Sequence, residues 1–587
     1  MVQEARHDTH YSRAEDVEEF VRILEAYERG EISAEDFRAF RLTRGVYGQR
    51  QADVNMIRVK FAGGVMSAAA LRVAAEVAAE HAAWRKGHVT TRQSIQFHNL
   101  QLAETPALMA RFAAVGVTTV EACGNTVRNI TGCPFAGVSP TEAFDVTPYL
   151  QATVRLCLRA PWANDLPRKF KMAFEGCSHE DHAQTAINDV GFRAKIREGV
   201  RGFEVFVAGG LSTSPRPGYR LHDFIPADEL LGRVEPLVRL FGDLGNRKNK
   251  ARARLKYVMK KLGEDGFRAA YDAEVAKIAE AGRLHQPIEL PPEESAPKAR
   301  PDALVGHAAA EDDPEYRAWL RCVDPQKQEG FATVTVKLHR GDVTAEQFAA
   351  LAGIVERFAD GTLRTGNRQN LMIRWVRNRA LPRLYVALRE IGLADAGANT
   401  IHDIVSCPGA DTCNLAVTSS MSLASHLTRF LKKPGASAES VELARGLDIK
   451  ISGCPNSCGQ HHVAAIGFHG TVRHVGGGRQ VPEYQLHLGG GFDEDGVHFG
   501  RHIVKIPAQR SGEALLALLD LYRDEREEGE DPRSFFSRVS KEEVIAALGD
   551  NVLASDFSNL RDGDTSDLGQ DPGKAFNVAI GAGECAA

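Results

Sequence analysis

The stretch "LPRKFKMAFEGC" (166–177) is matched 277 residues later by "ARGLDIKISGC" (444–454). The same offset relates Gly64 to Gly341, and each of these glycines follows a strand pattern and precedes a helix pattern. One offset held over strands, helices and glycine turns indicates two copies of one unit. The period is far too long for a solenoid, so we interpret the chain as an internal duplication.

The overall composition is that of an ordinary globular protein. The chain has 587 residues, 43% of them hydrophobic and 25% charged, with a net charge of −5. This balance gives no global indication of nucleic-acid or membrane binding. No run approaches the roughly 18 uncharged apolar residues of a membrane span, and the start lacks an apolar signal-peptide segment. We therefore expect a cytoplasmic protein.

Four of the ten cysteines fall in two tight pairs. Cys407 and Cys413 have C-x5-C spacing, and Cys454 and Cys458 have C-x3-C spacing. In a reducing compartment such pairs indicate a metal site more than disulfides. Two short loops that supply two thiolates each suit an iron–sulfur cluster. Structural zinc, which usually uses C-x2–4-C in both pairs, is the alternative.

The first copy has only part of this cysteine set. Cys177 falls on Cys454, but the segment "CSHED" offers no cysteine at the position of Cys458. Loss of ligands in one copy predicts a single metal centre per chain, at a pseudo-symmetric interface.

The first copy instead concentrates positive charge. Lys169 and Lys171 alternate with Phe170 and Met172, so in a strand the two lysines share one face. Two ammonium groups on one face repel each other unless an anion lies between them, which predicts a site for a dianion. Further cations in matching strands and turns are Arg58, Arg92 and Arg128.

Five motifs together carry a family resemblance. In this order, "TTRQSIQFH" (90–98), "RNITGCP" (128–134), "LPRKFK", "CPGADTC" and "GCPNSCGQHH" resemble the assimilatory sulfite and nitrite reductases. The resemblance covers about residues 40–550. It implies a sirohaem coupled to a [4Fe–4S] cluster, and six-electron reduction of sulfite to sulfide in sulfate assimilation. A ferredoxin-dependent nitrite reductase, which makes ammonia from nitrite, is the alternative.

A rival of another class is a zinc- or cluster-bearing nucleic-acid-binding protein. It would explain the cysteine pairs and the basic segment 245–261, which has eight Lys or Arg and no acid. It leaves "TTRQ", "RKFK" and the duplication without a role. For the basic segment, a solvated helix face, a docking site for acidic ferredoxin and a contact with sirohaem carboxylates all remain open.

The resemblance also implies roles for single residues. The implied cluster ligands are Cys407, Cys413, Cys454 and Cys458, of which Cys458 also bridges to the sirohaem iron. The residues that match the cations around the bound oxyanion are Arg58, Arg128, Lys169 and Lys171. The residues that match sirohaem contacts are Thr90, Arg92, Gln96 and Asn456, with His88 at a position where some relatives have arginine. A covalent link between Cys123 and Tyr47 is possible in this family, and Cys585 is expected to be an idle thiol.

Three sequence features bear on the substrate and on the electron donor. Sulfite reductases keep "K-x-K" at 169–171, whereas many plant-type nitrite reductases have Asn at the second position, so Lys171 favours sulfite. No G-x-G-x-x-G strand–turn–helix is present, so we expect electrons from a partner. "RGVYGQRQ" and "CPGADTC" resemble the ferredoxin-dependent branch. A separate flavoprotein is the alternative donor.

The expected fold is α+β, three-lobed and internally duplicated, a sulfite/nitrite reductase fold with ferredoxin-like half-domains. We expect an N-terminal helical extension (1–49), a pseudo-symmetric domain (50–118 plus 328–395), a first sirohaem-binding domain (119–290), a linker (291–327), a second domain with the cluster (396–550) and an extended C-terminal tail (551–587).

Overall fold

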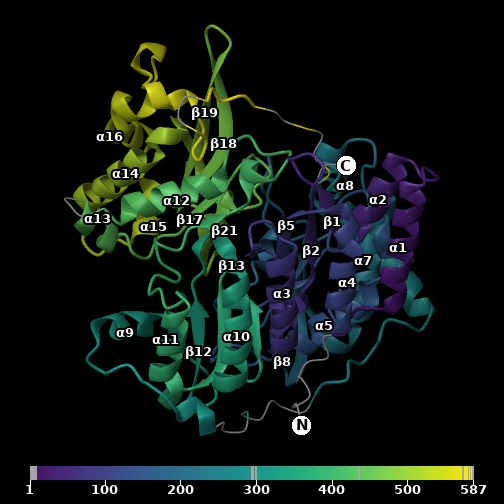
Figure 1. Cartoon of the computed structure of the whole chain (residues 1–587). Coiled ribbons are helices and arrows are strands. Elements are labelled where there is room, and N and C mark those ends of the chain that lie inside the picture. The colour runs from purple at the N-terminus through teal and green to yellow at the C-terminus, as the bar shows by residue number, and fades with distance from the viewer. Residues whose placement is uncertain are drawn as a thin grey trace.

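The computed structural model of the chain describes residues 10–291, 297, 301–433, 437–571, 574–578, 581 and 584. Within these residues the chain forms four five-stranded sheets and one two-stranded sheet, with helices around them. Figure 1 shows the helices α12, α14 and α16 of the second copy at the upper left and the N-terminal helices at the right. Mixed helices and sheets agree with the expected α+β class.

The polar sequence over 16–45 predicts one amphipathic helix, but the structure has two there, α1 (Ala14–Glu28) and α2 (Ala34–Thr43). Gly30 has a φ of +75°, which ends the first helix. The Ser33 hydroxyl then accepts a hydrogen bond from the Asp36 N–H at 3.1 Å and begins the second.

Two half-domains of about equal length repeat one order of elements. The first contains β1 (Val46–Gly48), β2 (Asn55–Val59), β3 (Val65–Ser67), α3 (Ala68–Glu80), β4 (Lys86–Val89), β5 (Ile95–Leu100) and α4 (Thr105–Ala114). The second contains β11 (Val323–Pro325), β12 (Phe331–Val336), β13 (Asp342–Thr344), α10 (Ala345–Phe358), β14 (Thr362–Thr365), β15 (Leu371–Arg377) and α11 (Leu381–Glu390).

In the sequence, Ser67 and the pair Thr344 and Gln347 are typical of helix starts, and Gly87 is expected to end the Ala-rich first helix. Ser67 caps α3, and Thr344 with Gln347 forms the expected capping box of α10. The expected end of α3 at Gly87 is wrong: α3 ends at Glu80, and Gly87 lies inside β4. The Ala-rich pattern stops where "HAAWRKG" no longer repeats at helical spacing.

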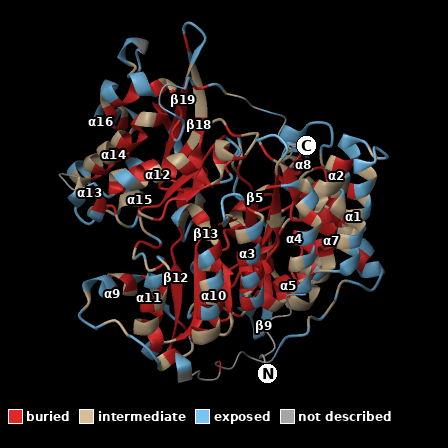
Figure 2. Cartoon of the chain, viewed as in Figure 1, coloured by how far each residue is buried: buried red, intermediate tan, exposed pale blue. Residues whose placement is uncertain are grey.

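The two half-domains exchange strands. The sheets have the orders β1-β2-β5-β4-β13 and β11-β12-β15-β14-β3, so each is completed by a strand of the other copy. Both crossing contacts are antiparallel, with Asp342 opposite His88 and Ser67 opposite Thr362. The helices α3 and α10 lie side by side over these sheets, and their inner faces are buried (Figure 2). The exchange joins the two copies into one hydrophobic core.

Two glycines mark equivalent turns in this core. Gly64 has a φ of +75° and Gly341 a φ of +73°. A Cβ atom on Gly64 would lie 2.5 Å from the carbonyl oxygen of Thr365, and one on Gly341 would lie 2.7 Å from that of Val89. Each turn therefore requires glycine for both conformation and space. The sequence offset thus corresponds to a structural equivalence.

Each copy continues into a larger sheet with helices. The first has the order β10-β9-β8-β7-β6 and the second β16-β17-β18-β19-β22. In both, the three strands that come first in the chain are parallel and the rest antiparallel. The first includes β6 (Thr131–Gly132), α5 (Thr147–Cys157), α6 (Pro161–Asn164), β7 (Met172–Glu175), β8 (Val190–Arg197), β9 (Val200–Val207), β10 (Tyr219–Pro226), α7 (Leu230–Leu244) and α8 (Leu255–Glu280).

The second larger domain carries more helices on its outer side. It includes β16 (Val405–Ser406), α12 (Ser420–Leu431), α13 (Ala438–Leu443), β17 (Ile449–Ser452), β18 (Ile466–Val475), β19 (Arg479–Leu488), β20 (Gly491–Asp493), β21 (Gly496–His498), β22 (Arg501–Pro507), α14 (Ser511–Glu525), α15 (Pro532–Arg538) and α16 (Lys541–Leu553). The strands β20 and β21 form a hairpin of their own.

The segments named as linker and tail hold some regular structure. Within 291–327 the chain forms α9 (Pro314–Trp319) and β11, which pairs with β12. In the tail, Gly581 N–H donates to the carbonyl of Asn414, and Glu584 pairs with Arg41. The tail thus runs from the second copy to the N-terminal helices (Figure 1). Cys585 lies outside the described residues.

No helix among the described residues is both long enough and apolar enough to cross a membrane.

Candidate active site

The two cysteine loops follow neighbouring parallel strands. Cys407 comes directly after β16, and Cys454 comes two residues after β17, which pairs with β16 in parallel. Because the carboxyl ends of parallel strands meet at one sheet edge, the loops are adjacent. Gly453 N–H donates to the Cys407 sulfur at 3.3 Å, and Val417 N–H donates to the Gly453 carbonyl at 2.7 Å. The structure therefore brings both predicted pairs to one place.

Glycines let these loops curl tightly. Gly409 has a φ of +61°, and a Cβ atom there would lie 2.3 Å from the Ser420 hydroxyl. A Cβ atom on Gly459 would lie 1.9 Å from the carbonyl oxygen of Ile451. Neither position has room for any other side chain.

The electrostatics of Cys407 and Cys454 favour a metal. Burial, and then negative charge on Cys458 and Cys407, raises the pKa of Cys454 to about 12. Burial and charge on Cys458 likewise raise the pKa of Cys407. Thiols this close to one another oppose each other's ionisation unless a cation holds the thiolates. The donor set therefore fits an iron–sulfur cluster, with Cys458 the one exposed cysteine of the four.

Two arginines converge beside Cys123. Arg128 Nε donates to the Ala122 carbonyl at 3.0 Å, and Arg58 Nη1 donates to the same oxygen at 3.3 Å. Gln96 lies opposite Arg58 in the pairing of β2 with β5. With its amide oxygen turned toward Arg58, it accepts a hydrogen bond from Nε at 3.2 Å. These contacts fix the direction of the guanidinium of Arg58.

Arg92 is the most strongly desolvated arginine of the group. It donates to Asn188 Oδ1 and to the carbonyl of Asn129, both at 2.7 Å. Burial, and then Arg128, lowers its pKa to about 9. Its Nε is buried without a hydrogen-bond partner among the described residues. An anion placed there would supply both the missing acceptor and the missing charge.

Lys171 belongs to the same cation group. The backbone N–H of Lys171 donates to Asp189 Oδ2 at 2.8 Å, and the Asp189 carboxylate also forms an ion pair with Arg254 at 2.7 Å. Burial, and then the charges of Arg92, Arg254 and Lys169, lowers the pKa of Lys171 well below its ordinary value, while negative charge on Cys458 opposes this. Lys171 therefore lies close enough to the cluster loop to respond to its charge. Phe170 and Met172 are buried and both lysines are half-exposed, but β7 begins only at Met172, so the strand that the sequence predicted over Lys169 and Lys171 does not form there.

The loop after β4 links the cations to the cluster loop. Thr91 Oγ1 donates to the Cys458 carbonyl at 2.9 Å. Thr90 Oγ1 accepts from the N–H groups of Arg92 and Ser94, which shapes the turn. On the other side, Ser212 Oγ donates to Asn456 Oδ1 at 3.4 Å. The loop after β4 and the Ser212 segment thus both contact the second cysteine loop.

Other residues at the site were not singled out from the sequence. Asp189 carried no signal, because a lone acid after a loop is unremarkable. Arg254 was visible only as part of the basic segment 245–261. Gln93 is buried and donates to the carbonyls of Gly132 and Thr365, and Gln369 donates to that of Val89 in the other copy. His88 Nδ1 lies 3.2 Å from Oδ1 of Asp342, a residue of the second copy, and not among the cations around Arg92.

Tyr47 and Cys123 share one small buried cluster with Leu42 and Met56. Arg58 lies against both, with Nη1 3.3 Å from the Cys123 sulfur and the guanidinium carbon 5.5 Å from the centre of the Tyr47 ring. The covalent link between Tyr47 and Cys123 stays a prediction.

Family models match most of the chain. The model described as "Nitrite and sulphite reductase 4Fe-4S domain" matches residues 123–278 and 397–551. The model described as "Nitrite/Sulfite reductase ferredoxin-like half domain" matches residues 47–115 and 324–391. Each model thus matches twice, once in each copy.

Individual relatives agree with these models. "Sulfite reductase [ferredoxin] 1" of Mycolicibacterium paratuberculosis is 29% identical over 497 residues, which is 84% of each chain. "Ferredoxin--nitrite reductase" of Synechococcus elongatus is 30% identical over 456 residues, 76% of this chain and 81% of the relative. The solved structure titled "Structure of Mycobacterium tuberculosis NirA protein" matches with a TM-score of 0.75 and 28% identity, over 91% of this chain and 98% of that one.

A duplicated α+β fold that places four cysteines beside a group of buried cations defines an oxidoreductase with a sirohaem and a [4Fe–4S] cluster. The chain belongs to the nitrite and sulfite reductase family.

Proposed function

We propose that this enzyme reduces sulfite to sulfide in a six-electron reaction, with ferredoxin as the electron donor. The observation that carries the choice of sulfite is the pair Lys169 and Lys171. Both are half-exposed in the segment just before β7, and the charges of Arg92, Arg254 and Lys169 all act on Lys171. Two ammonium groups in such a group match a dianion with three oxygens better than a monoanion with two.

Each cation has a distinct task in this proposal. Arg58 and Arg128, held by the Ala122 carbonyl, present fixed guanidinium groups that bind and orient oxygen atoms. Lys171, whose pKa is depressed, gives up a proton readily and so supplies protons to oxygens that leave as water. Sirohaem and the cluster, when bound, supply the electrons one at a time. The residues that would hold them are the four cysteines, Arg92 and the loop 90–92.

Nitrite is the second candidate substrate. The nitrite reductase of Synechococcus elongatus is as similar to this chain as the mycobacterial sulfite reductase. Nitrite is a monoanion and asks for less positive charge, so the same site would also accept it. The proposal concerns preference, measured as kcat/KM for each anion.

The substitution Lys171→Asn tests the substrate. We expect kcat/KM for sulfite to fall by roughly tenfold more than kcat/KM for nitrite, because only the dianion needs the second ammonium group. Steady-state rates with reduced ferredoxin measure both. The matched control is Lys195→Asn, a surface lysine on β8 paired with Glu204. Equal losses for both anions, or a wild-type preference for nitrite, would overturn the choice of sulfite.

The proposed ferredoxin surface is part of the basic segment 245–261. Two of its eight cations are turned inward: Arg254 pairs with Asp189, and Lys256 donates to the carbonyls of Leu211 and Ser214. The other six are exposed, namely Arg247, which pairs with Asp165, and Lys248, Lys250, Arg252, Lys260 and Lys261. The segment therefore presents positive charge outward close to the site, as docking of an acidic protein requires.

Charge reversal tests this surface. We expect Lys248→Glu with Lys250→Glu to raise the KM for ferredoxin several-fold at low salt and to weaken its dependence on ionic strength. The rate with a small chemical reductant should not change, because the substrate site is untouched. Lys505→Glu, an exposed lysine on β22, serves as the control. An unchanged KM for ferredoxin in the double variant would reject the docking surface.

A further inference from the structure

The pairing registers of the two larger sheets identify equivalent residues without any choice of alignment. In the first copy, Thr131 of β6 pairs with Ala173 of β7, and in the second Val405 of β16 pairs with Lys450 of β17. Likewise Met172 pairs with Val190, and Ile449 pairs with Ile466. The loops after these strands are therefore equivalent, residue by residue, counted from the strands.

This count gives every cluster cysteine a counterpart in the first copy. Cys407 directly follows β16, and Cys133 directly follows β6. Cys454 follows β17 by two residues, and Cys177 follows β7 by two. Cys458 precedes β18 by eight residues, and the residue that precedes β8 by eight is His182. The counterpart of Cys413 is Ser139.

A contact at the pseudo-two-fold axis supports the last of these assignments. Gln184 and Gln460 stand two residues after His182 and Cys458, and both have positive φ values, +56° and +66°. Each begins a short helical turn, and their amides hydrogen-bond to each other at 3.0 Å. The offset of 277 residues finds no counterpart of Cys458 in the first copy, because the loop between Cys177 and β8 is one residue longer than the loop between Cys454 and β18. The structure places an imidazole at that position.

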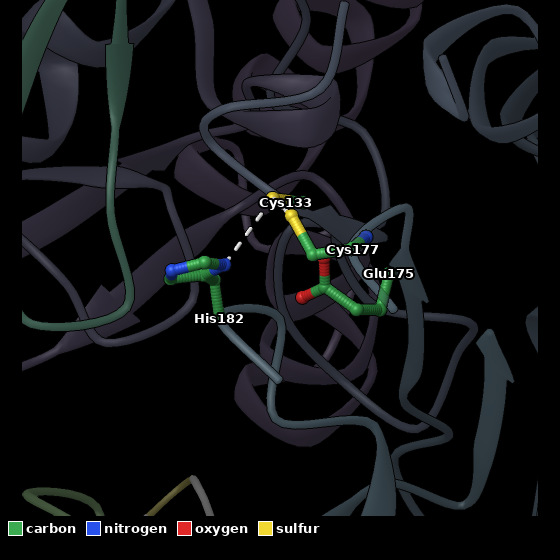
Figure 3. A group of neighbouring side chains, drawn as sticks. All are labelled: Cys133, Glu175, Cys177 and His182. Carbon is green, nitrogen blue, oxygen red and sulfur yellow. Dashed lines mark hydrogen bonds between the residues drawn. The ribbon is translucent and has the colours of Figure 1, made fainter. Parts of the chain in front are cut away.

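Figure 3 shows that the side chains of Cys133, Cys177 and His182 converge in the first copy, together with that of Glu175. The sulfur of Cys133 lies 3.7 Å from that of Cys177 and 3.7 Å from His182 Nδ1. With a carboxylate oxygen of Glu175, the four potential ligand atoms all lie within 4.8 Å of one another. Cys133, Cys177 and Glu175 are fully buried, and His182 is half-buried.

The distances are those of a tetrahedral metal site. Zinc–sulfur bonds of about 2.3 Å and zinc–nitrogen bonds of about 2.0 Å give tetrahedron edges of about 3.8 Å between sulfurs and about 3.5 Å between sulfur and nitrogen. The separation of 3.7 Å between the two sulfurs and that of 3.7 Å between the Cys133 sulfur and His182 Nδ1 are close to these edges. The set of two thiols, an imidazole and a carboxylate is a donor set that zinc accepts.

The surroundings hold these ligands in place. Glu175 accepts hydrogen bonds from the N–H groups of Gly176 and Cys177 at 2.9 Å and of Ala183 at 2.8 Å. The Ser139 hydroxyl lies 3.3 Å from the Cys177 sulfur. The chain itself thus holds the carboxylate of Glu175 and the sulfur of Cys177 in position before a cation arrives.

We propose that Cys133, Cys177, His182 and Glu175 form a second metal site, which holds a structural zinc ion at the position that mirrors the iron–sulfur cluster. Each ligand binds the ion in its deprotonated form, so binding releases to solvent the protons that the two thiols, the carboxyl group and the coordinating imidazole nitrogen carry, and the site has no redox step. The ion joins three chain segments: the loop that begins five residues after Arg128, the loop that ends β7 beyond Lys171, and the turn before β8. The ion would therefore stabilise the positions of the segments that carry Arg128 and Lys171.

The test is a metal analysis of the full chain purified with its cofactors. We expect about one zinc per chain after dialysis against a weak chelator, beside the iron of the cofactors. X-ray absorption at the zinc edge reads this ion alone, and should show two sulfurs at about 2.3 Å with nitrogen and oxygen at about 2.0 Å. This readout is independent of sulfite or nitrite turnover, so its failure is distinct from failure of the proposed function.

Matched variants locate the zinc. Cys177→Ala and His182→Gln should lose it, whereas Cys157→Ala, at a buried cysteine on α5, should retain it. A second close group of potential ligands is formed by His461, His469 and His487. The variant His469→Gln would lose zinc bound at that group, and we expect it to retain the zinc. The proposal is overturned by a wild-type chain without zinc, by zinc that remains in Cys177→Ala, or by a zinc shell without sulfur. A Cys133–Cys177 disulfide found by peptide mapping of a zinc-free chain would likewise overturn it.

Discussion

Arg92 shows how a single residue can be unfavourable for folding and still fit the site. Its guanidinium is buried, shares its surroundings with Arg128 and Arg254, and has a pKa lowered to about 9. In the chain without cofactors such a cation destabilises the fold. An anionic cofactor reverses the sign of this interaction, because sirohaem carries eight carboxylates.

From this we predict opposite effects of Arg92→Gln on cofactor content and on stability. The sirohaem content of the purified variant should fall severalfold, measured as Soret absorbance per chain. The unfolding midpoint of the cofactor-free chain should stay the same or rise, because a buried like-charge repulsion is removed.

A surface arginine provides the comparison for this prediction. Arg197→Gln, at the exposed end of β8, should leave both quantities unchanged. An Arg92→Gln chain with full sirohaem content would contradict the role given to Arg92.

At the scale of elements, the cysteine loops depend on glycine as much as on sulfur. A methyl group at position 459 would lie 1.9 Å from the Ile451 carbonyl oxygen and 2.8 Å from its carbon, so strand β17 and the loop would have to separate. That strand carries Cys454 beyond its end. The loop geometry and the ligand positions are therefore coupled.

We predict that Gly459→Ala lowers the iron and acid-labile sulfide content of the chain by at least about half, through displacement of Cys458 and Cys454. Gly446→Ala is the matched control, because a Cβ atom there meets nothing within 4 Å. Cluster content unaffected by Gly459→Ala would show that the loop has more freedom than its packing indicates.

The sequence predicted the elements of this fold where the two copies kept one offset. The strands around Gly64 and Gly341, the capping box of α10 and both cysteine pairs were visible because each motif is local. The exchange of β3 and β13 between sheets was not predictable, because each is three residues long and its partner is in the other copy. His182 was hidden by one extra residue in its loop, which breaks the offset just where the ligand lies.

At the scale of the whole molecule, duplication has produced unequal sites at equivalent positions. Four cysteines in the second copy correspond to two cysteines, a serine and a histidine in the first, and the cations around Lys171 belong to the first copy alone. The half-domains join the copies by exchanged strands, and Gln184 meets Gln460 at the axis. In the proposed site, one copy thus supplies the cysteines and the other supplies the positive charge.

Histidines buried in the half-domains and in the second larger domain resist protonation, which lowers the stability of the molecule in acid. His98 lies in β5 between Trp84 and His88, and both of its ring nitrogens lack a hydrogen-bond partner among the described residues. Burial, and then His88, lowers its pKa from 6.5 to about 3. His426 has its pKa lowered to about 4 by burial and by Arg429.

The sign of the effect follows from proton linkage. Between pH 3 and pH 6.5 the unfolded chain binds a proton at His98 and the folded chain does not, so the free energy of unfolding falls as the pH falls through this range. From His98 alone the loss at pH 5, relative to pH 7, is about 2 kcal/mol. We predict that His98→Phe, which keeps a ring and sacrifices no hydrogen bond, makes unfolding at pH 5 take up about one proton fewer. Urea unfolding at several pH values measures this slope, with the exposed His307→Gln as control. An unchanged slope in His98→Phe would mean that His98 is already protonated in the folded chain at pH 5, and that its burial between the two copies does not limit acid stability.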